Sequence, residues 1–188
     1  VPFEQSDAFE AVAYGLPALE AGRWWTPITG TFFVNQPWVY ILTLGGFWGM
    51  AYLEYRRGTR VALAYFSIGQ LFAVLATSLV LWACALLPWP WAQTAAATLD
   101  VGPSGGTMAC IAAAITLFVS PWRLRALVVL LAFVFIAVLF WGAIEDLEHL
   151  LAVLLVLGVD RSLRPQRVTV REQRLLAFVS IVAIGAVQ

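Results

Sequence analysis

Long apolar runs separated by short polar segments dominate this sequence. Six runs are candidates for membrane-crossing helices: 31–53, 61–87, 105–120, 124–143, 144–159 and 175–188. A helix needs roughly 20 apolar residues to cross about 30 Å of hydrocarbon. The third and fifth runs are shorter, and we expect such helices to lie centrally in a bundle, where protein and water receive their ends. The pattern predicts an all-α fold, a polytopic transmembrane helical bundle of about six spans.

These runs divide the chain into four predicted parts. Residues 1–30 form an outward-facing interfacial segment, in which 8–21 are predicted to form an amphipathic helix. Residues 31–159 form the transmembrane core, 160–174 an arginine-rich cytoplasmic connector, and 175–188 the start of a further transmembrane helix. The sequence begins without Met and ends inside an apolar run. We therefore expect a membrane helix before it and more chain after it.

Composition supports a membrane location and excludes several classes of function. Hydrophobic residues make up 62% of the chain and charged residues only 12%, about half the charged fraction of a soluble domain. The net charge is zero and Lys is absent, so nucleic acid is not an expected partner. A chain that uses Arg without Lys and is rich in Ala, Leu, Val and Trp is typical of a GC-rich bacterial genome. We expect the bacterial cytoplasmic (inner) membrane, with membrane lipids as partners.

The arginines predict the orientation. Ten of the eleven lie in three alternate loops, at 56–60, 123–125 and 161–174. The segments on the other side carry most of the acidic residues and a single Arg23. By the positive-inside rule the arginine loops are cytoplasmic. The segments 1–30 and 88–103, and the turn before Glu145, then face outward.

Two features carry candidate chemistry. His149 is the only histidine, and Ser104 lies in the sequence Gly-Pro-Ser-Gly-Gly at 102–106. Each has a simple structural interpretation: a histidine solvated at the interface, and a serine that caps a helix. The functional interpretation makes Ser104 a nucleophile on a tight turn. There Gly102 and Gly105 would let backbone N–H groups approach a developing oxyanion.

The two features are more informative together. Ser104 lies above about 16 apolar residues counted from the cytoplasmic charges, and His149 above about 11 to 14. Both therefore fall in the outer half of the membrane. A nucleophile and its base must come within about 3 Å of each other. The positions predict a Ser–His dyad at the floor of an outward-open cavity.

At these residues the chain resembles the rhomboid intramembrane serine proteases, over about residues 22–158. In that family a Gly-x-Ser-Gly motif opens a short central helix and supplies the nucleophile. Gly102, Ser104 and Gly105 match this motif, and Ala109 matches a small residue one turn later. The resemblance implies a serine endopeptidase, with outward-facing active site, whose substrates are transmembrane proteins.

Other parts of the motif set are also present. The family's base is a histidine followed by a small residue one turn on, which His149 and Ala152 match. A stretch at the cytoplasmic end of the family's second helix resembles Leu53, Glu54, Gly58 and Arg60, and its tryptophan-containing start resembles 23–26. By this alignment the run 175–188 is an additional span.

One departure from the family concerns the oxyanion. The second helix of the family normally carries a His and, four residues on, an Asn. Here Trp38 and Leu42, or Tyr40 and Leu44, take those places. Losing one oxyanion donor typically costs ~100- to 1000-fold in rate, although the Tyr40 hydroxyl and backbone N–H groups near Ser104 are available.

The departure keeps a second function open. The alternative is a catalytically inactive rhomboid-like domain that binds or anchors a membrane protein or a lipid. Such a domain could also form part of a larger lipid-modifying membrane enzyme. Residues 171–176 resemble actinobacterial membrane proteins that join a rhomboid-like unit to a lipid-aminoacylating domain.

Cofactors and metals are not expected. Cys84 and Cys110 lie in separate apolar runs without metal-ligand spacing. One histidine and two scattered cysteines cannot assemble a haem pair or an iron–sulfur site. Channels and transporters are disfavoured because the runs contain almost no charge and no repeat.

Overall fold

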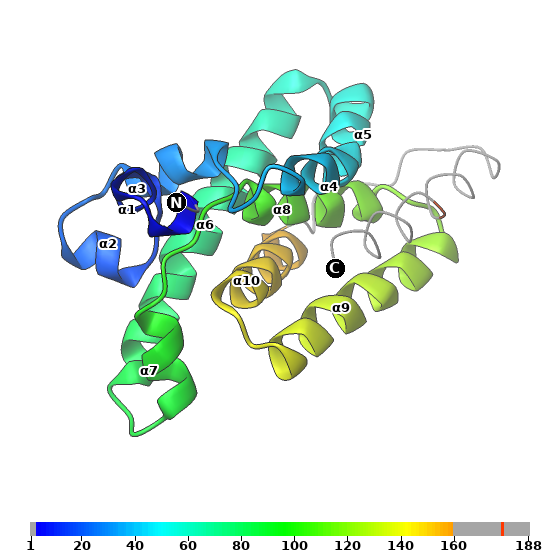
Figure 1. Ribbon diagram of the computed structural model, residues 1–188. Helices are drawn as coiled ribbons and strands as arrows, with labels where there is room; N and C mark the ends of the chain where they lie inside the picture. The colour runs from blue at the N-terminus through cyan, green and yellow to red at the C-terminus, as the bar shows by residue number, and fades with distance from the viewer. Residues whose placement is uncertain (1–2, 160–177, 179–188) are drawn as a thin grey trace.

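The computed structural model describes residues 3–159 and 178, and Figure 1 shows their arrangement. This part of the chain is helical and contains no β-strand, which confirms the predicted all-α class. The helices are η1 (Phe3–Gln5), α1 (Asp7–Val12), α2 (Leu16–Glu20), α3 (Thr26–Thr29), η2 (Gly30–Phe32), α4 (Val39–Gly46), α5 (Trp48–Arg57), α6 (Thr59–Ala85), α7 (Pro90–Ala96), α8 (Ser104–Thr116), α9 (Trp122–Phe140) and α10 (Ile144–Val159).

The short helix α8 is the centre of the fold. It has 13 residues, and every one after Ser104 is buried. Helices α5, α6, α9 and α10 pack around it (Figure 1). This central place agrees with the expectation from its length.

Small residues bring α5 and α6 unusually close to α8. A Cβ added at Gly69 of α6 would collide with the Cβ of Ala109, and one added at Gly49 of α5 would lie 2.7 Å from the backbone of Ile111. Ala109 is fully buried, as is Ala152 of α10 in the same hydrophobic core. Without side chains at the two glycines, backbones can approach in a way that larger residues would prevent.

Two of the described helices, α6 and α9, are long and apolar enough to cross a membrane. Helix α9 keeps large apolar side chains on its outside, including Leu124, Phe135 and Leu139. Exposed apolar surface of this kind suits contact with lipid rather than water. The other predicted spans are shorter helices, and the run 175–188 lies outside the described residues except for Phe178.

The predicted span 31–53 is not a single helix. A polar loop precedes α4, and Phe47 separates α4 from α5, which continues to Arg57. The residue before Pro37 is disfavoured in helical geometry, and adjacent glycines at 45 and 46 weaken the end of α4. The prediction followed the apolar content and overlooked these local breaks.

The predicted amphipathic helix at 8–21 is likewise wrong. It is divided into α1 and α2 because the backbone of Tyr14 pairs with Asp100, with N···O distances of 2.9 and 2.8 Å. Gly15 follows with φ of 139°, a conformation that favours glycine. Pro17 then lies in the first turn of α2. A long-range pairing thus replaced the local helix.

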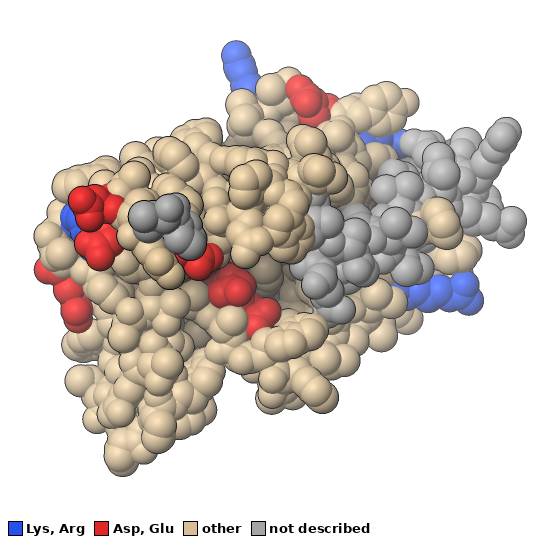
Figure 2. Space-filling view, in the orientation of Figure 1, with Lys and Arg blue, Asp and Glu red and all other residues tan. Residues whose placement is uncertain are grey.

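Charge is unevenly distributed over the face in Figure 2. Acidic side chains gather over the N-terminal helices and continue to the middle of the face, and acidic atoms also lie near the top. Basic side chains lie mainly beside the start of α9 and at the top, with further basic atoms at the left edge beside the acidic ones. The arginines at the start of α9 are Arg123 and Arg125.

Candidate functional site

The turn before α8 is held by residues from two distant segments. Gly102 has φ of 144°, in a region that favours glycine. Its N–H donates to the carbonyl of Gly30 at 3.0 Å. Its own carbonyl accepts from the Tyr14 hydroxyl and from Nε2 of Gln70, each at 2.9 Å. The position of the serine that follows is therefore set by tertiary contacts.

Gln70 joins the turn to the helix. Besides its bond to Gly102, its Oε1 accepts from the backbone N–H of Gly106 at 2.8 Å. The side chain is 2% exposed, so both bonds form in a dry environment where unpaired groups are costly. The sequence analysis missed this residue. A lone glutamine in an otherwise apolar run was the available signal.

Ser104 begins α8 without capping it. The cap position is Pro103, and no side chain caps the helix there. The carbonyl of Pro103 accepts a hydrogen bond from the Thr107 hydroxyl at 2.8 Å. Within the described residues the Ser104 hydroxyl has no hydrogen-bond partner. The helix-cap interpretation of Ser104 is therefore wrong, and its hydroxyl is available for other chemistry.

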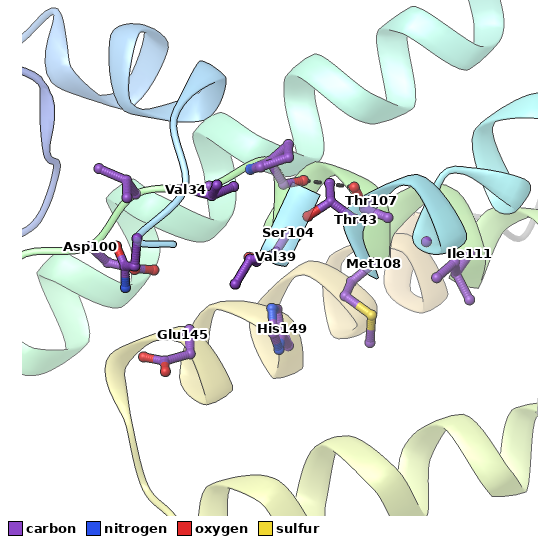
Figure 3. A pocket seen from close by; sticks show the side chains of 15 residues that line it. Val34, Val39, Thr43, Asp100, Ser104, Thr107, Met108, Ile111, Glu145 and His149 are labelled. Atoms are coloured by element: carbon purple, nitrogen blue, oxygen red, sulfur yellow. Dashed lines mark hydrogen bonds between the residues drawn. The ribbon is translucent and has the colours of Figure 1, made fainter. Parts of the chain in front are cut away.

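Ser104 and His149 line one cavity of about 250 Å³. Figure 3 shows His149 extending from α10 toward the space beneath α4 and α8, where Ser104 lies. His149 is only 7% exposed, so it is not the solvated interfacial histidine of the simple interpretation. Its Nε2 is buried and has no hydrogen-bond partner among the described residues. The fold thus brings the two predicted residues to the same cavity, but no hydrogen bond joins them.

The remaining predicted residues have different places. The Tyr40 side chain is 47% exposed, does not line this cavity, and donates its hydroxyl to the carbonyl of Phe32 at 3.1 Å. Gly105 faces α6: a Cβ there would lie 2.8 Å from the Cβ of Ala73 and 3.2 Å from Oε1 of Gln70. Gly105 therefore permits close helix packing, and Tyr40 contributes nothing to the cavity wall.

Three uncharged polar side chains in the cavity were not predicted, and one of them is Thr107, whose hydroxyl donates to the carbonyl of Pro103. Asn35, from the loop before α4, and Thr43, from α4, both line the cavity (Figure 3 labels Thr43). The Oδ1 atom of Asn35 is buried without a partner among the described residues. The polar stretch 35–36 within an apolar run was the signal for Asn35. The sequence contains no comparable signal for Thr43, because threonine is common in apolar helices.

Two carboxyl side chains also line the cavity. Asp100 and Glu145 line it, and both also line a second cavity of about 550 Å³. Burial, and then the nearby Glu145, raise the pKa of Asp100 to about 7. No group of three or more His, Cys, Asp and Glu side chains in the described part of the chain is arranged to hold a metal ion.

Comparisons with family models, curated proteins and solved structures gave no match. The site is therefore interpreted from its own residues and geometry.

Proposed function

We propose that the chain is a rhomboid-like intramembrane serine protease of the bacterial inner membrane, which hydrolyses peptide bonds of transmembrane substrates near their outer ends. The observation that carries the proposal is the shared cavity of Ser104 and His149. Each side chain comes from a different helix, and each has an unpaired polar atom at or near the cavity. A hydroxyl and an imidazole in this relation are the minimum for nucleophilic acyl transfer.

The proposed reaction has two stages. Nε2 of His149 takes the Ser104 proton as Oγ attacks the scissile carbonyl carbon, and then gives it to the departing amine, which leaves an ester on Ser104. A water molecule, deprotonated by His149, hydrolyses the ester and restores both residues. Movement of one or both side chains has to bring Oγ of Ser104 and Nε2 of His149 within hydrogen-bond distance for this step.

The oxyanion needs hydrogen-bond donors, and the Tyr40 hydroxyl was predicted from the sequence to be one of them. Since Tyr40 lies outside the cavity, the better candidates are the backbone N–H of Ser104 at the start of α8 and the side chains of Asn35 and Thr43. The N-terminus of α8 adds positive potential at this point. This set replaces the histidine and asparagine that the resemblance would require.

A cleavage assay tests the proposal. We expect the purified protein in liposomes to cut a model transmembrane substrate, and Ser104→Ala or His149→Ala to lower the rate by at least about 1000-fold. A fluorophosphonate probe should label the wild type and not Ser104→Ala. Ser67→Ala, at an exposed serine of α6, is the matched control and should keep full activity. Unchanged cleavage by folded Ser104→Ala contradicts the proposal.

The second candidate, an inactive rhomboid-like domain, is favoured by one observation: Ser104 and His149 are not hydrogen bonded in this structure. It predicts that a transmembrane partner or lipid binds the protein equally well with and without Ser104→Ala, and that no substrate is cut. Binding and cleavage measured on the same preparation separate the two functions.

A further inference from the structure

The second cavity adjoins the Ser104 cavity and differs from it in chemistry. Asn35, Asp100 and Glu145 line both cavities, so the two share a wall. The second cavity adds a third acidic residue, Glu4, from the N-terminal segment. Among the described residues no arginine lines either of them, and His149 lines only the first. A negative potential therefore lies next to the proposed nucleophile.

Aromatic rings complete the second cavity. Trp91, Trp141 and Phe9 contribute to its wall. The indole N–H of Trp91 donates to the carbonyl of Gly142 at 2.6 Å, which ties α7 to the loop before α10. The Trp141 ring is 59% exposed. Carboxylates beside aromatic faces are a combination that favours organic cations, through ion pairing and cation–π attraction.

The shared wall contains a buried hydrogen-bonding atom, Oδ1 of Asn35, that has no partner among the described residues. The first cavity adds a second: His149 lines it, is 7% exposed, and its Nε2 has no partner in the same part of the chain. A buried polar atom without a partner calls for a physical explanation, and a role in binding or catalysis is one such explanation. The acidic, aromatic end and the unpaired imidazole thus belong to one continuous binding region.

From this arrangement we propose that the second cavity is a specificity subsite for a basic side chain, Arg or Lys, in the outer flank of the transmembrane substrate. Asp100 and Glu145 pair with the cation, and Trp141 covers it. The proposal rests on the proposed protease function. It gives selectivity because positively charged residues are rare on the outer side of transmembrane segments.

Substrates that differ at one flanking position test this subsite. A set of model transmembrane substrates carries Arg, Gln or Glu at a single position in the outer flank. The substituted position is shifted by one residue from one substrate to the next. At the best position we expect the wild type to cut the Arg substrate about tenfold faster in kcat/KM than the Gln substrate, and the Glu substrate slowest. Glu145→Gln should bring the Arg-to-Gln ratio close to one. Glu145 is exposed, so this change should not disturb folding.

Two controls are needed to interpret the Arg-to-Gln ratios. Glu20→Gln removes the same charge from an exposed position that lines neither cavity, and it should keep the wild-type ratio. Binding of the same peptides to Ser104→Ala is measured in parallel, in liposomes with and without amine headgroups.

The outcomes separate the two proposals. Cleavage of Arg and Gln substrates at equal rates overturns the subsite and leaves the protease. Arg-selective binding without any cleavage supports the subsite and overturns the protease. Loss of Arg selectivity only when amine headgroups are present shows that a lipid amine competes with the peptide for the cavity, which supports a cation subsite there.

Discussion

At the scale of single residues, the site depends on side chains whose partners lie far away in the sequence. Tyr14 reaches the carbonyl of Gly102, 88 residues later, and its backbone pairs with Asp100. Both residues are buried. The Ser104 turn is therefore fastened to the N-terminal segment, although nothing local in either stretch indicates the contact.

Asp100 should make stability depend on pH. Its pKa rises from 3.8 to about 7 in the folded protein, first because of burial and then because of Glu145. The folded state therefore holds a proton that the unfolded chain has lost. The free energy of unfolding should fall as pH rises from about 4 through 7, by up to about 1.4 kcal/mol per pH unit for one proton. Thermal unfolding in detergent over this range measures it.

The matched variants for this prediction are Asp100→Asn and Asp7→Asn. Asp100→Asn should make the pH dependence shallower, whereas Asp7→Asn, at an exposed position in α1, should leave it as in the wild type. An Asp100→Asn protein with the wild-type pH slope would show that another group causes the dependence.

At the scale of helices, the contact between α6 and α8 determines where Ser104 lies. Glycines at 69, 105 and 106 let the two helices approach closely, because a Cβ at any of them would meet atoms of the other helix. Gln70 lies in the same interface and holds both the turn and the first turn of α8. Close packing and hydrogen bonding thus act on the same short stretch.

Replacing Gln70 should loosen this contact. Gln70→Leu leaves the buried N–H of Gly106 unpaired, at about 1–3 kcal/mol, and removes one of the two hydrogen bonds to the Gly102 carbonyl, which keeps its bond from Tyr14. We therefore expect a clearly lower unfolding temperature and slower cleavage. Gln93→Leu is the control, since Gln93 is exposed on α7 and donates only to the carbonyl of Leu87 at 3.3 Å. If the two variants unfold at the same temperature, the two bonds of Gln70 contribute little.

At the scale of the whole molecule, the fold places a short buried helix inside a group of longer ones. Helices α6 and α9 are long enough to cross a membrane, and α8 and α10 pack between or beside them. The proposed six-span arrangement, with the N-terminal helices outside, would put the Ser104 cavity on the outward side.

Cysteine labelling tests that orientation. In a background with Cys84→Ser and Cys110→Ala, we expect Glu20→Cys to react with a membrane-impermeant maleimide on intact spheroplasts. Arg123→Cys should react only after the membrane is opened. The reverse pattern would place the cavity on the cytoplasmic side and contradict the proposed orientation.

The sequence by itself determined the helical class, the approximate positions of α6, α8, α9 and α10, and the pair Ser104 and His149 as candidates. These follow from local properties: apolar run length, turn residues, and the rarity of ionisable groups in apolar segments. The break at Phe47 also has local causes in proline and glycine, which apolar content outweighed in the prediction, whereas the division of the N-terminal helix comes from the pairing of Tyr14 with Asp100.

Only the tertiary structure decided what surrounds Ser104. Gln70, Asn35 and Thr43 lie near it because helices distant in sequence pack together, and Tyr40 points elsewhere for the same reason. Hydrogen bonds and cavities between such elements depend on sub-ångström packing of glycines and small side chains. The periodicity of the sequence does not indicate which residues of two distant helices face each other. The neighbours of Ser104 can therefore be identified only from the three-dimensional arrangement of the helices.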